Sequence, residues 1–509
     1  MQKEVPKNGE LNKQEKRNIA TAAKGGSFGF IGKLYVQGIS LFFVFLITRT
    51  FGAEQYGLYR LAILIATITA AISLIGLDGG VKRYVAIARS EHNKSKLWGV
   101  IQLGTLVPLA IGLFLSLVLC LSAEMVAEHI FHKPELAPML RLSSMAVPFL
   151  VLVSSLSDIA IGFKKMEYNV YSKDLAFNGF KLLFSLVVIL LGFQIQYVLV
   201  AFIAAAAFST GVSIFFFNKL FPLRELPSKA ERQNKEILRY SFPLFLSLLL
   251  NQFGRNFEAL VLGAYGILAD VGIYSVILTL SNIGNMGFVA LRSISNPIFA
   301  ELHHQKNFDE LRRYYQTINR WSVSFNIPIF LLIVIFPDNI LQVFGDEFSA
   351  GTTGLIILAL GTLFNASTGA CGALLNMSGY SKMNFYNSVV YLMTTLALDF
   401  LLIPKYGLVG AALAGSLTYV IINSLMMIEV YILIKKILPF NLSIYKPLLA
   451  GLLAGVSAYY TKSIILSDLP ILQLILIGST MLLVYGGVLK LLRFSEEDRF
   501  IFKKIFKKR

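Results

Sequence analysis

Residues 241–264 read SFPLFLSLLLNQFGRNFEALVLGA and decide the fold, because a predominantly apolar run continues on both sides of Arg255 and Glu258. A membrane-spanning helix needs about 20 predominantly apolar residues, so this stretch predicts a helix within the bilayer. An ionised side chain at that depth costs about 2.5–3.5 kcal/mol on insertion scales. A cost of this size indicates that Arg255 has a function inside the membrane.

The composition indicates an integral membrane protein. Of the 509 residues, 56% are hydrophobic and 15% are charged, whereas soluble domains carry about 25% charged residues. The net charge of +17 comes from Lys and Arg in short segments between apolar runs, which is typical of cytoplasmic loops and argues against nucleic acid as a partner. Cys120 and Cys371 have no metal-site spacing, and we expect neither a metal nor a cofactor.

Apolar runs of spanning length recur, and they predict an all-α integral membrane protein with about 14 transmembrane helices. In the first half they lie at 27–48, 58–77, 97–122, 137–160, 172–192 and 195–217. In the second half they lie at 241–263, 272–295, 317–337, 350–376, 384–403 and 407–434, followed by 446–462 and 469–492.

These spans divide the chain into two six-helix bundles and several smaller parts. The predicted parts are a basic N-terminal tail at 1–26, an N-terminal bundle at 27–217, a linker at 218–240, a C-terminal bundle at 241–436, two additional helices at 437–492 and a basic amphipathic tail at 493–509.

Alternate loops differ sharply in positive charge. The loop expected after the second span contains Lys82, Arg83 and Arg89, whereas the loops at 192–196 and 264–272 contain neither Lys nor Arg. Because Lys and Arg are enriched in cytoplasmic loops, we expect a multi-pass protein of the plasma (cytoplasmic) membrane with both termini and the linker in the cytoplasm. The sequence near 300–318 predicts a short amphipathic helix on the same surface.

The two halves resemble each other at an offset of about 215 residues. GLYRLAI at 57–63 matches GIYSVIL at 272–278, and GFKKME at 162–167 matches GYSKMN at 379–384. Since six spans separate equivalent positions, the halves have the same orientation and form a parallel repeat about an axis along the membrane normal. Such a repeat predicts a transporter that rocks one bundle against the other, with its substrate between the halves near mid-membrane.

Three features together resemble a known family. They are the opening GGSFGFIGKLYVQGISLFFVFLITRTFGAEQYGLYRLAI at 25–63, the basic central linker, and the paired loops GFKKMEYN and GYSKMNFY. The chain resembles the polysaccharide-biosynthesis branch of the multidrug/oligosaccharidyl-lipid/polysaccharide (MOP) exporter superfamily, which includes O-antigen flippases.

The resemblance implies a MATE-like fold of two six-helix repeats plus two C-terminal helices. It also implies a flippase that moves a polyprenyl-diphosphate-linked oligosaccharide from the cytoplasmic to the outer leaflet by alternating access, for cell-surface polysaccharide biosynthesis. The partners implied are the lipid bilayer, the lipid-linked glycan and, as a further candidate class, polysaccharide-assembly proteins.

A diphosphate head needs cations in the cavity, and arginine suits phosphate through its planar fork. The basic candidates are Arg255, Lys33, Lys181, Arg60 and Arg292, and the amides that would bind sugar hydroxyls are Gln37, Gln252, Asn251 and Asn256. Alternatives remain open for these residues: Arg255 pairs with Glu258 on one helical face, Lys33, Arg60 and Arg292 snorkel to an interface, and the amides bond to neighbouring helices.

Acids within or beside the spans are candidates for ion or proton coupling. They are Glu258, Asp158, Asp78, Asp399 and Glu429. Asp399 and Glu429 lie near predicted span ends, which favours a solvated carboxylate at both positions.

Two other functions compete with the flippase. A cation-coupled multidrug antiporter of the same superfamily would favour carboxylates over cations in its cavity. A membrane polysaccharide polymerase would be an enzyme, but the sequence has no Asp-x-Asp motif, no P-loop and no long external loop to hold an active site. We therefore expect a transporter and no catalytic residues.

Overall fold

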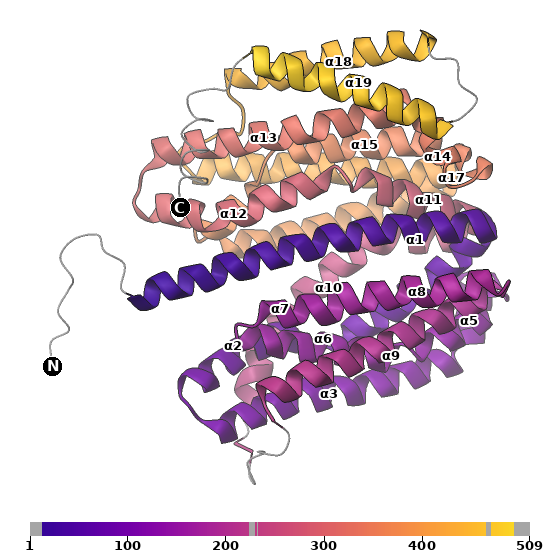
Figure 1. Cartoon of the computed structure of the whole chain (residues 1–509). Coiled ribbons are helices and arrows are strands. Elements are labelled where there is room, and N and C mark those ends of the chain that lie inside the picture. The colour runs from indigo at the N-terminus through magenta and orange to yellow at the C-terminus, as the bar shows by residue number, and fades with distance from the viewer. Residues whose placement is uncertain (1–12, 223–229, 232, 465–469, 493–509) are drawn as a thin grey trace.

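The computed structural model describes residues 13–222, 230–231, 233–464 and 470–492 of the chain. These residues are helical apart from short turns and contain no β-strand, so the predicted all-α fold is confirmed (Figure 1). Residues 1–12 of the predicted N-terminal tail, part of the linker and the whole predicted tail at 493–509 lie outside the described residues.

The N-terminal half begins with one long broken helix. α1 (Lys13–Ser73) has non-helical backbone at Gly52, with φ 78° and ψ 177°, so that it forms two predicted spans in one element. The half continues through α2 (Leu77–Ser90), α3 (Lys94–Leu121), α4 (Ala123–Met125), the π-helix η1 (Val126–Ile130), α5 (Leu136–Ser144), α6 (Val147–Gly162), α7 (Met166–Asn169), the π-helix η2 (Val170–Ala176), α8 (Phe177–Leu190) and α9 (Ile195–Leu220).

The C-terminal half follows the same plan. It consists of α10 (Asn234–Tyr265), α11 (Leu268–Ser281), α12 (Asn285–His304), α13 (Phe308–Ile335), α14 (Pro337–Gln342), the 3-10 helix η4 (Asp346–Gly351), α15 (Thr352–Ser367), α16 (Cys371–Met377) and α17 (Ser381–Leu433), which is broken at Gly407. A short 3-10 turn, η5 (Leu442–Ile444), leads into α18 (Tyr445–Ile464) and α19 (Pro470–Leu491), which cover the outer face of this half (Figure 1).

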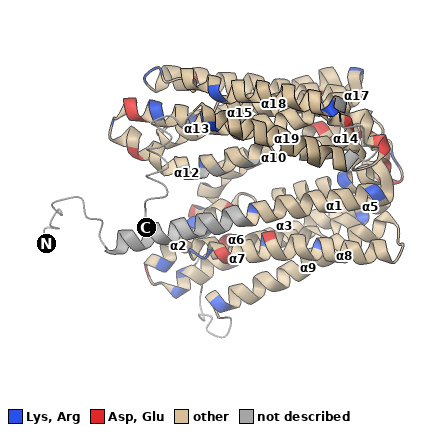
Figure 2. Ribbon diagram, turned by 45° about the horizontal axis from the view of Figure 1, so that its top comes forward, with Lys and Arg blue, Asp and Glu red and all other residues tan. Residues whose placement is uncertain are grey.

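The outer surface is built for lipid. Nine of the described helical segments are long and apolar enough to cross a membrane, and charged residues gather mainly near the helix ends (Figure 2). Large apolar side chains such as Phe114, Leu190 and Leu483 are exposed on outer faces. α10 is not among the nine segments although it has 32 residues, because the polar residues at 251–258 lower its hydropathy.

Two predictions about the loops are wrong. The basic residues Lys82, Arg83 and Arg89 lie within α2 and not in a loop. The amphipathic surface helix predicted near 300–318 is instead a hairpin, in which α12 ends at His304 and the much longer α13 begins after a turn. The apolar runs predict only the part of a helix that lies in the bilayer, and α2, α12 and α13 continue beyond their apolar parts.

Capping side chains define where the next helices begin. The side chain of Asn93 accepts a hydrogen bond from the backbone N–H of Lys96 at 2.9 Å, and that of Asn307 accepts one from the N–H of Glu310 at 3.3 Å. An asparagine cap satisfies one of the free N–H groups in the first turn of a helix. The two caps occupy equivalent positions in the two halves, which supports the repeat.

The turns of the two halves also share their backbone conformation. Three positions with positive φ, which is uncommon for residues other than glycine, recur in both halves. The pairs, each 214 or 215 residues apart, are His92 and Lys306, Lys164 and Gly379, and Gly192 and Gly407. The offset found in the sequence is therefore present in the geometry of the loops.

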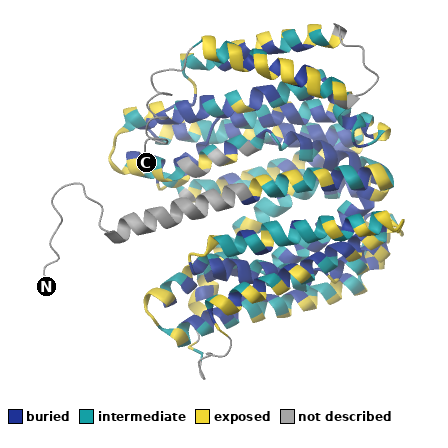
Figure 3. Cartoon of the chain, viewed as in Figure 1, coloured by how far each residue is buried: buried dark blue, intermediate teal, exposed yellow. Residues whose placement is uncertain are grey.

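The halves share one core at one side of the molecule and have separate cores at the other. We call the side where α9 ends and α10 begins the linker side, and the side where α1 is broken at Gly52 the closed side. On the closed side, apolar residues of α1, α5 and α9 share one core with those of α10, α11, α15 and α17. On the linker side each half has its own core, with Ile237 of α10 packed into that of the N-terminal half (Figure 3).

Two glycines of the repeat meet at the closed side. A Cβ atom on Gly57 would overlap the carbonyl oxygen of Leu268, and one on Gly272 would overlap that of Ala53. Gly57 and Gly272 open the matched GLYRLAI and GIYSVIL stretches, so the same position of each half contacts its counterpart. Only residues without a side chain allow backbones to approach this closely.

Polar groups also connect the two halves on the closed side. Arg49 of α1 donates hydrogen bonds from Nε to the carbonyl oxygen of Val343 and from Nη2 to that of Gln342, both at 2.7 Å. The Glu347 carboxylate accepts the backbone N–H of Ala53, next to the break in α1, at 2.5 Å. These contacts tie the broken helix of one half to the η4 region of the other.

Removing the Arg49 contacts should loosen the closed side. We expect Arg49→Ala to raise the labelling rate of a cysteine placed at Leu268, in a background without the two native cysteines, by about fivefold, since an exposed charged contact contributes about 1 kcal/mol or less. A membrane-impermeant maleimide measures this rate. The matched control is Arg141→Ala, which breaks an exposed ion pair with Glu124 inside one half. Equal rates in the two variants would show that Arg49 does not hold the halves together.

Candidate functional site

A cavity of about 760 Å³ lies in the C-terminal half where that half faces α1. It runs from Asn384, one turn from the linker-side start of α17, to Glu258, two turns from the end of α10. Its polar lining residues are Gln37 of α1; Asn251, Arg255 and Glu258 of α10; Tyr274, Asn282, Asn285 and Arg292 of α11, α12 and the turn between them; Asn365 of α15; and Asn384, Asn387, Ser388, Tyr391, Tyr419 and Asn423 of α17.

The cavity is less evenly shared than the sequence predicts. Of the described residues, Gln37 is the one lining residue that the N-terminal half contributes. Of the predicted site residues, Arg255, Arg292, Asn251, Gln37 and Glu258 line this cavity.

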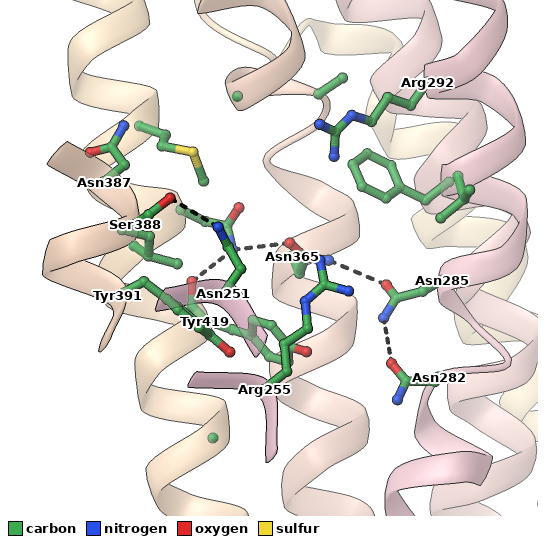
Figure 4. Close-up of a pocket in the computed structure, with 18 of the residues that line it drawn as sticks. Asn251, Arg255, Asn282, Asn285, Arg292, Asn365, Asn387, Ser388, Tyr391 and Tyr419 are labelled. Carbon is green, nitrogen blue, oxygen red and sulfur yellow. Dashed lines mark hydrogen bonds between the residues drawn. The ribbon is translucent and has the colours of Figure 1, made fainter. Parts of the chain in front are cut away.

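Arg255 and Arg292 bring two positive charges into the cavity (Figure 4). Both side chains are exposed, and within the described part of the chain neither makes an ion pair or a hydrogen bond. The alternative ion pair between Arg255 and Glu258 is absent, although the two residues lie one helical turn apart. The two guanidinium groups are near enough to repel each other, so the cavity holds positive charge that no ion pair among the described residues neutralises.

A chain of carboxamides crosses the cavity wall between the two arginines and α17. Asn285 donates a hydrogen bond to Oδ1 of Asn282 at 3.1 Å, Asn365 donates to Asn285 at 3.2 Å, and Asn423 donates to Asn365 at 3.1 Å. Thr368 completes the chain by donating to Oδ1 of Asn423 at 3.3 Å. We call the four asparagines the asparagine ladder; it connects the turn between α11 and α12 with α12, α15 and α17, and Figure 4 labels Asn282, Asn285 and Asn365.

The ladder was not predicted from the sequence. Its members stand singly in separate apolar spans, apart from Asn282 and Asn285 in the segment SNIGN at 281–285. Asparagine is costly in hydrocarbon unless it is hydrogen-bonded. A search for amides inside spans would have found these positions, but not their convergence on one wall.

A pair of buried acids lies at the closed-side end of the cavity. Glu258 is 6% exposed and Asp399 is fully buried, and each carboxyl group acts on the other electrostatically. Neither oxygen of Asp399 has a hydrogen-bond partner. The prediction that Asp399 is solvated near a span end is therefore wrong, because the helix continues to the break at Gly407, two turns further.

The other candidate acids have partners or lie elsewhere. Asp158 of α6 forms an ion pair with Lys82 of α2 at 2.9 Å, and Asp78 lies in the first turn of α2. Glu429 accepts a hydrogen bond from Asn387 at 2.7 Å. Of these three acids, Glu429 is therefore the one bonded to a residue of the cavity wall.

The basic candidates of the N-terminal half do not line this cavity. The Lys181 ammonium lies 4.6 Å from the ring centroid of Phe43 and 3.3 Å from Oδ1 of Asn178, with Arg60 near enough to repel it. Lys33 is exposed on α1.

Two amide candidates on α10, Gln252 and Asn256, also lie outside the cavity wall. The side chain of Asn256 donates a hydrogen bond to the backbone carbonyl of Gln252 at 2.9 Å, within the helix itself. Asn251, by contrast, lines the cavity and donates a hydrogen bond from its side chain to the Ser388 hydroxyl at 3.2 Å.

The chain matches known protein families along most of its length. The family model described as "Polysaccharide biosynthesis protein" matches residues 22–303, and the MatE family model matches residues 243–401. The capsular polysaccharide biosynthesis protein CapF of Staphylococcus aureus is 24% identical over 303 residues, which cover 56% of this chain and 74% of CapF.

Solved structures share the fold. A structure described as lipid II flippase MurJ in an inward closed conformation has a TM-score of 0.73 at 18% identity, covering 92% of this chain and 99% of MurJ. An inward-facing multidrug resistance MATE family transporter has a TM-score of 0.64 at 15% identity, covering 79% of this chain and 94% of the transporter. The predicted MATE-like architecture is thereby confirmed. The chain belongs to the polysaccharide biosynthesis protein family, the polysaccharide flippase branch of the MOP superfamily, and is a transporter and not an enzyme.

Proposed function

We propose that the protein moves a polyprenyl-diphosphate-linked oligosaccharide from the cytoplasmic to the outer leaflet by alternating access, in the synthesis of a cell-surface polysaccharide. The observation that carries this proposal is the pair of exposed arginines, Arg255 and Arg292, which have no ion-pair partner among the described residues and lie in a cavity walled by amides. A diphosphate cannot enter hydrocarbon without compensation for its lost hydration. Two guanidinium forks supply that compensation through parallel hydrogen bonds to phosphate oxygens.

The proposed orientation places the linker side in the cytoplasm of a plasma-membrane protein, as the distribution of Lys and Arg favours. The closed side then faces outward, and the halves, whose cores are separate on the linker side, receive the cargo from the cytoplasm. The name of CapF refers to capsular polysaccharide biosynthesis and that of MurJ to flipping of lipid II, and both support the proposal.

Reconstitution tests the function directly. In proteoliposomes carrying a fluorescent polyprenyl-diphosphate oligosaccharide, the protein should make labelled lipid in the inner leaflet accessible to an impermeant quencher outside. Protein-free liposomes give the background. Efflux of a cationic dye without movement of the lipid-linked sugar would assign the chain to multidrug antiport, the competing activity that the cavity carboxylate Glu258 favours.

We propose further that Glu258 and Asp399 couple transport to a cation or proton. Neither carboxyl group has a basic partner in the part of the chain that the structure describes. Two such groups are unstable when both are charged and buried, so the pair favours binding of a proton or a metal cation. The pair adjoins the cavity at its closed-side end, where a change in its charge would act on both the arginines and the contact between the halves.

Asp399→Asn should separate transport from its driving force. The amide keeps the shape of the side chain but cannot ionise, so we expect stimulation by an imposed proton or sodium gradient to fall to the gradient-free rate. Quencher accessibility with each gradient measures this effect. The exposed Asp309→Asn serves as the control. A gradient that still stimulates the Asp399→Asn variant as in the unmodified protein would exclude Asp399 from coupling.

A further inference from the structure

We infer that the asparagine ladder recognises the sugar part of the cargo through its hydroxyl and N-acyl groups and selects uncharged sugars over acidic ones. This inference rests on the proposed function. The ladder, formed by Asn282, Asn285, Asn365 and Asn423, lines the same cavity as the two arginines, so a diphosphate bound there places its first sugars within reach of the carboxamides.

The ladder has unused hydrogen-bond donors. Asn423 uses both of its N–H groups, one to Asn365 and one to the carbonyl oxygen of Tyr419 at 2.8 Å. Asn285 and Asn365 each use one N–H within the ladder, and Asn282 uses neither within the described residues. Since each carboxamide has two N–H groups, four N–H groups remain for a ligand. Hydroxyl oxygens, ring oxygens and N-acyl carbonyls accept such bonds.

The hydrogen bonds within the ladder fix the orientation of its carboxamides. Each carboxamide is held by the one before it, so the free N–H groups are oriented in advance by bonds that connect four elements. Preorganised groups lose less entropy when a ligand binds. A polar wall of this kind also rejects a ligand that leaves its groups unpaired, which is how hydrogen-bonding sites achieve strong discrimination.

The charges around the ladder disfavour acidic sugars. The diphosphate occupies the two arginines, which leaves the ladder with uncharged groups. Glu258 lines the cavity, and Glu429 is hydrogen-bonded to the lining residue Asn387. A uronic acid would bring its carboxylate towards these acids, and like charges at close range reduce affinity.

Aromatic rings complete a sugar site. Tyr391 and Tyr419 lie on the α17 side of the cavity, and Phe288 lines it from α12 (Figure 4). Such rings offer apolar faces to the C–H groups of a sugar while the ladder serves its polar groups. The combination fits a hydroxyl-rich ring better than the flat organic cation of an antiporter.

Binding to protein in nanodiscs tests the inference with three probes. They are a polyprenyl diphosphate without sugar, the same lipid with an uncharged acetamido-disaccharide, and the same lipid with a uronic-acid disaccharide. We expect the uncharged glycolipid to bind about tenfold more tightly than the bare lipid, which two net hydrogen bonds supply, and more tightly than the acidic one. Asn365→Leu should abolish this tenfold preference.

Two further variants make the outcome decisive. If Asn365→Leu does not fold, Asn282→Ala takes its place. This variant removes the free end of the ladder without breaking its other bonds and should reduce the preference by about threefold. Asn256→Leu, on the same helix as Arg255 but outside the cavity wall, should change nothing. A preference retained by both ladder variants, or no preference in the unmodified protein, overturns the inference. Failure of the unmodified protein to bind any diphosphate lipid overturns the proposed function instead.

Discussion

The Arg255→Ala variant should lose transport of a lipid-linked glycan while it still folds and inserts in the membrane. Each hydrogen bond between a charged group and its ligand contributes about 1.5–3 kcal/mol, so the loss of even one of the two bonds that a guanidinium makes should weaken diphosphate binding by about 10- to 150-fold. Arg292 bears the second exposed charge in the cavity, and the double variant, Arg255→Ala with Arg292→Ala, should show no transport above protein-free liposomes. Quencher accessibility and affinity for the bare polyprenyl diphosphate measure the two effects.

A matched control comes from the same helix. Arg239 is exposed near the linker-side end of α10, outside the cavity, so Arg239→Ala tests the loss of a positive charge alone. Arg255→Lys tests the fork, because lysine keeps the charge but cannot make two parallel hydrogen bonds. If Arg255→Ala and Arg239→Ala transport equally well, positive charge in the cavity is not how this protein binds its cargo.

A single methyl group at Gly57 should block the transport cycle. The Cβ of Gly57→Ala would overlap the backbone carbonyl of Leu268, which cannot rotate away as a side chain can. The two halves must therefore move apart on the closed side, and we expect transport to fall to background. Overpacking of this kind costs about 1–3 kcal/mol, so the melting temperature should fall as well. Gly272→Ala should behave in the same way.

Accessibility distinguishes a forced opening from a general loss of fold. Labelling of a cysteine placed at Phe131, in a background without native cysteines, should rise in Gly57→Ala, because this buried residue belongs to the shared closed-side core. Gly211→Ala is the control, since a Cβ there meets no atom within 4 Å. Normal transport by Gly57→Ala would mean that the backbone contact is not required for closure.

Much of the fold follows from the sequence because the bilayer imposes a simple rule. Apolar length predicts helices, and the common offset of GLYRLAI and GIYSVIL predicts the repeat that the paired turns display. The ends of the helices do not follow from the same rule. The basic side chains of α2 lie beyond the apolar core, and the capping residue Asn93 defines the start of α3 more sharply than hydropathy does.

The candidate site is only partly predictable for a geometric reason. Arg255 and Lys181 both interrupt apolar spans, yet one faces the cavity and the other packs on Phe43 within the N-terminal half. The sequence alone does not give the rotation of each helix, which depends on packing. Convergent sites such as the ladder, whose members Asn282 and Asn423 are far apart in sequence, depend on several such rotations at once.

The contact between Gly57 and Gly272 has the symmetry of a dimer interface. In a symmetric dimer, residues on the two-fold axis meet their own copies, and here a residue meets its repeat counterpart in the same manner. The two halves of this single chain therefore meet as the subunits of a homodimer meet across an isologous interface. The C-terminal half contributes nearly all of the polar lining of the cavity, whereas both halves contribute the same position to this contact.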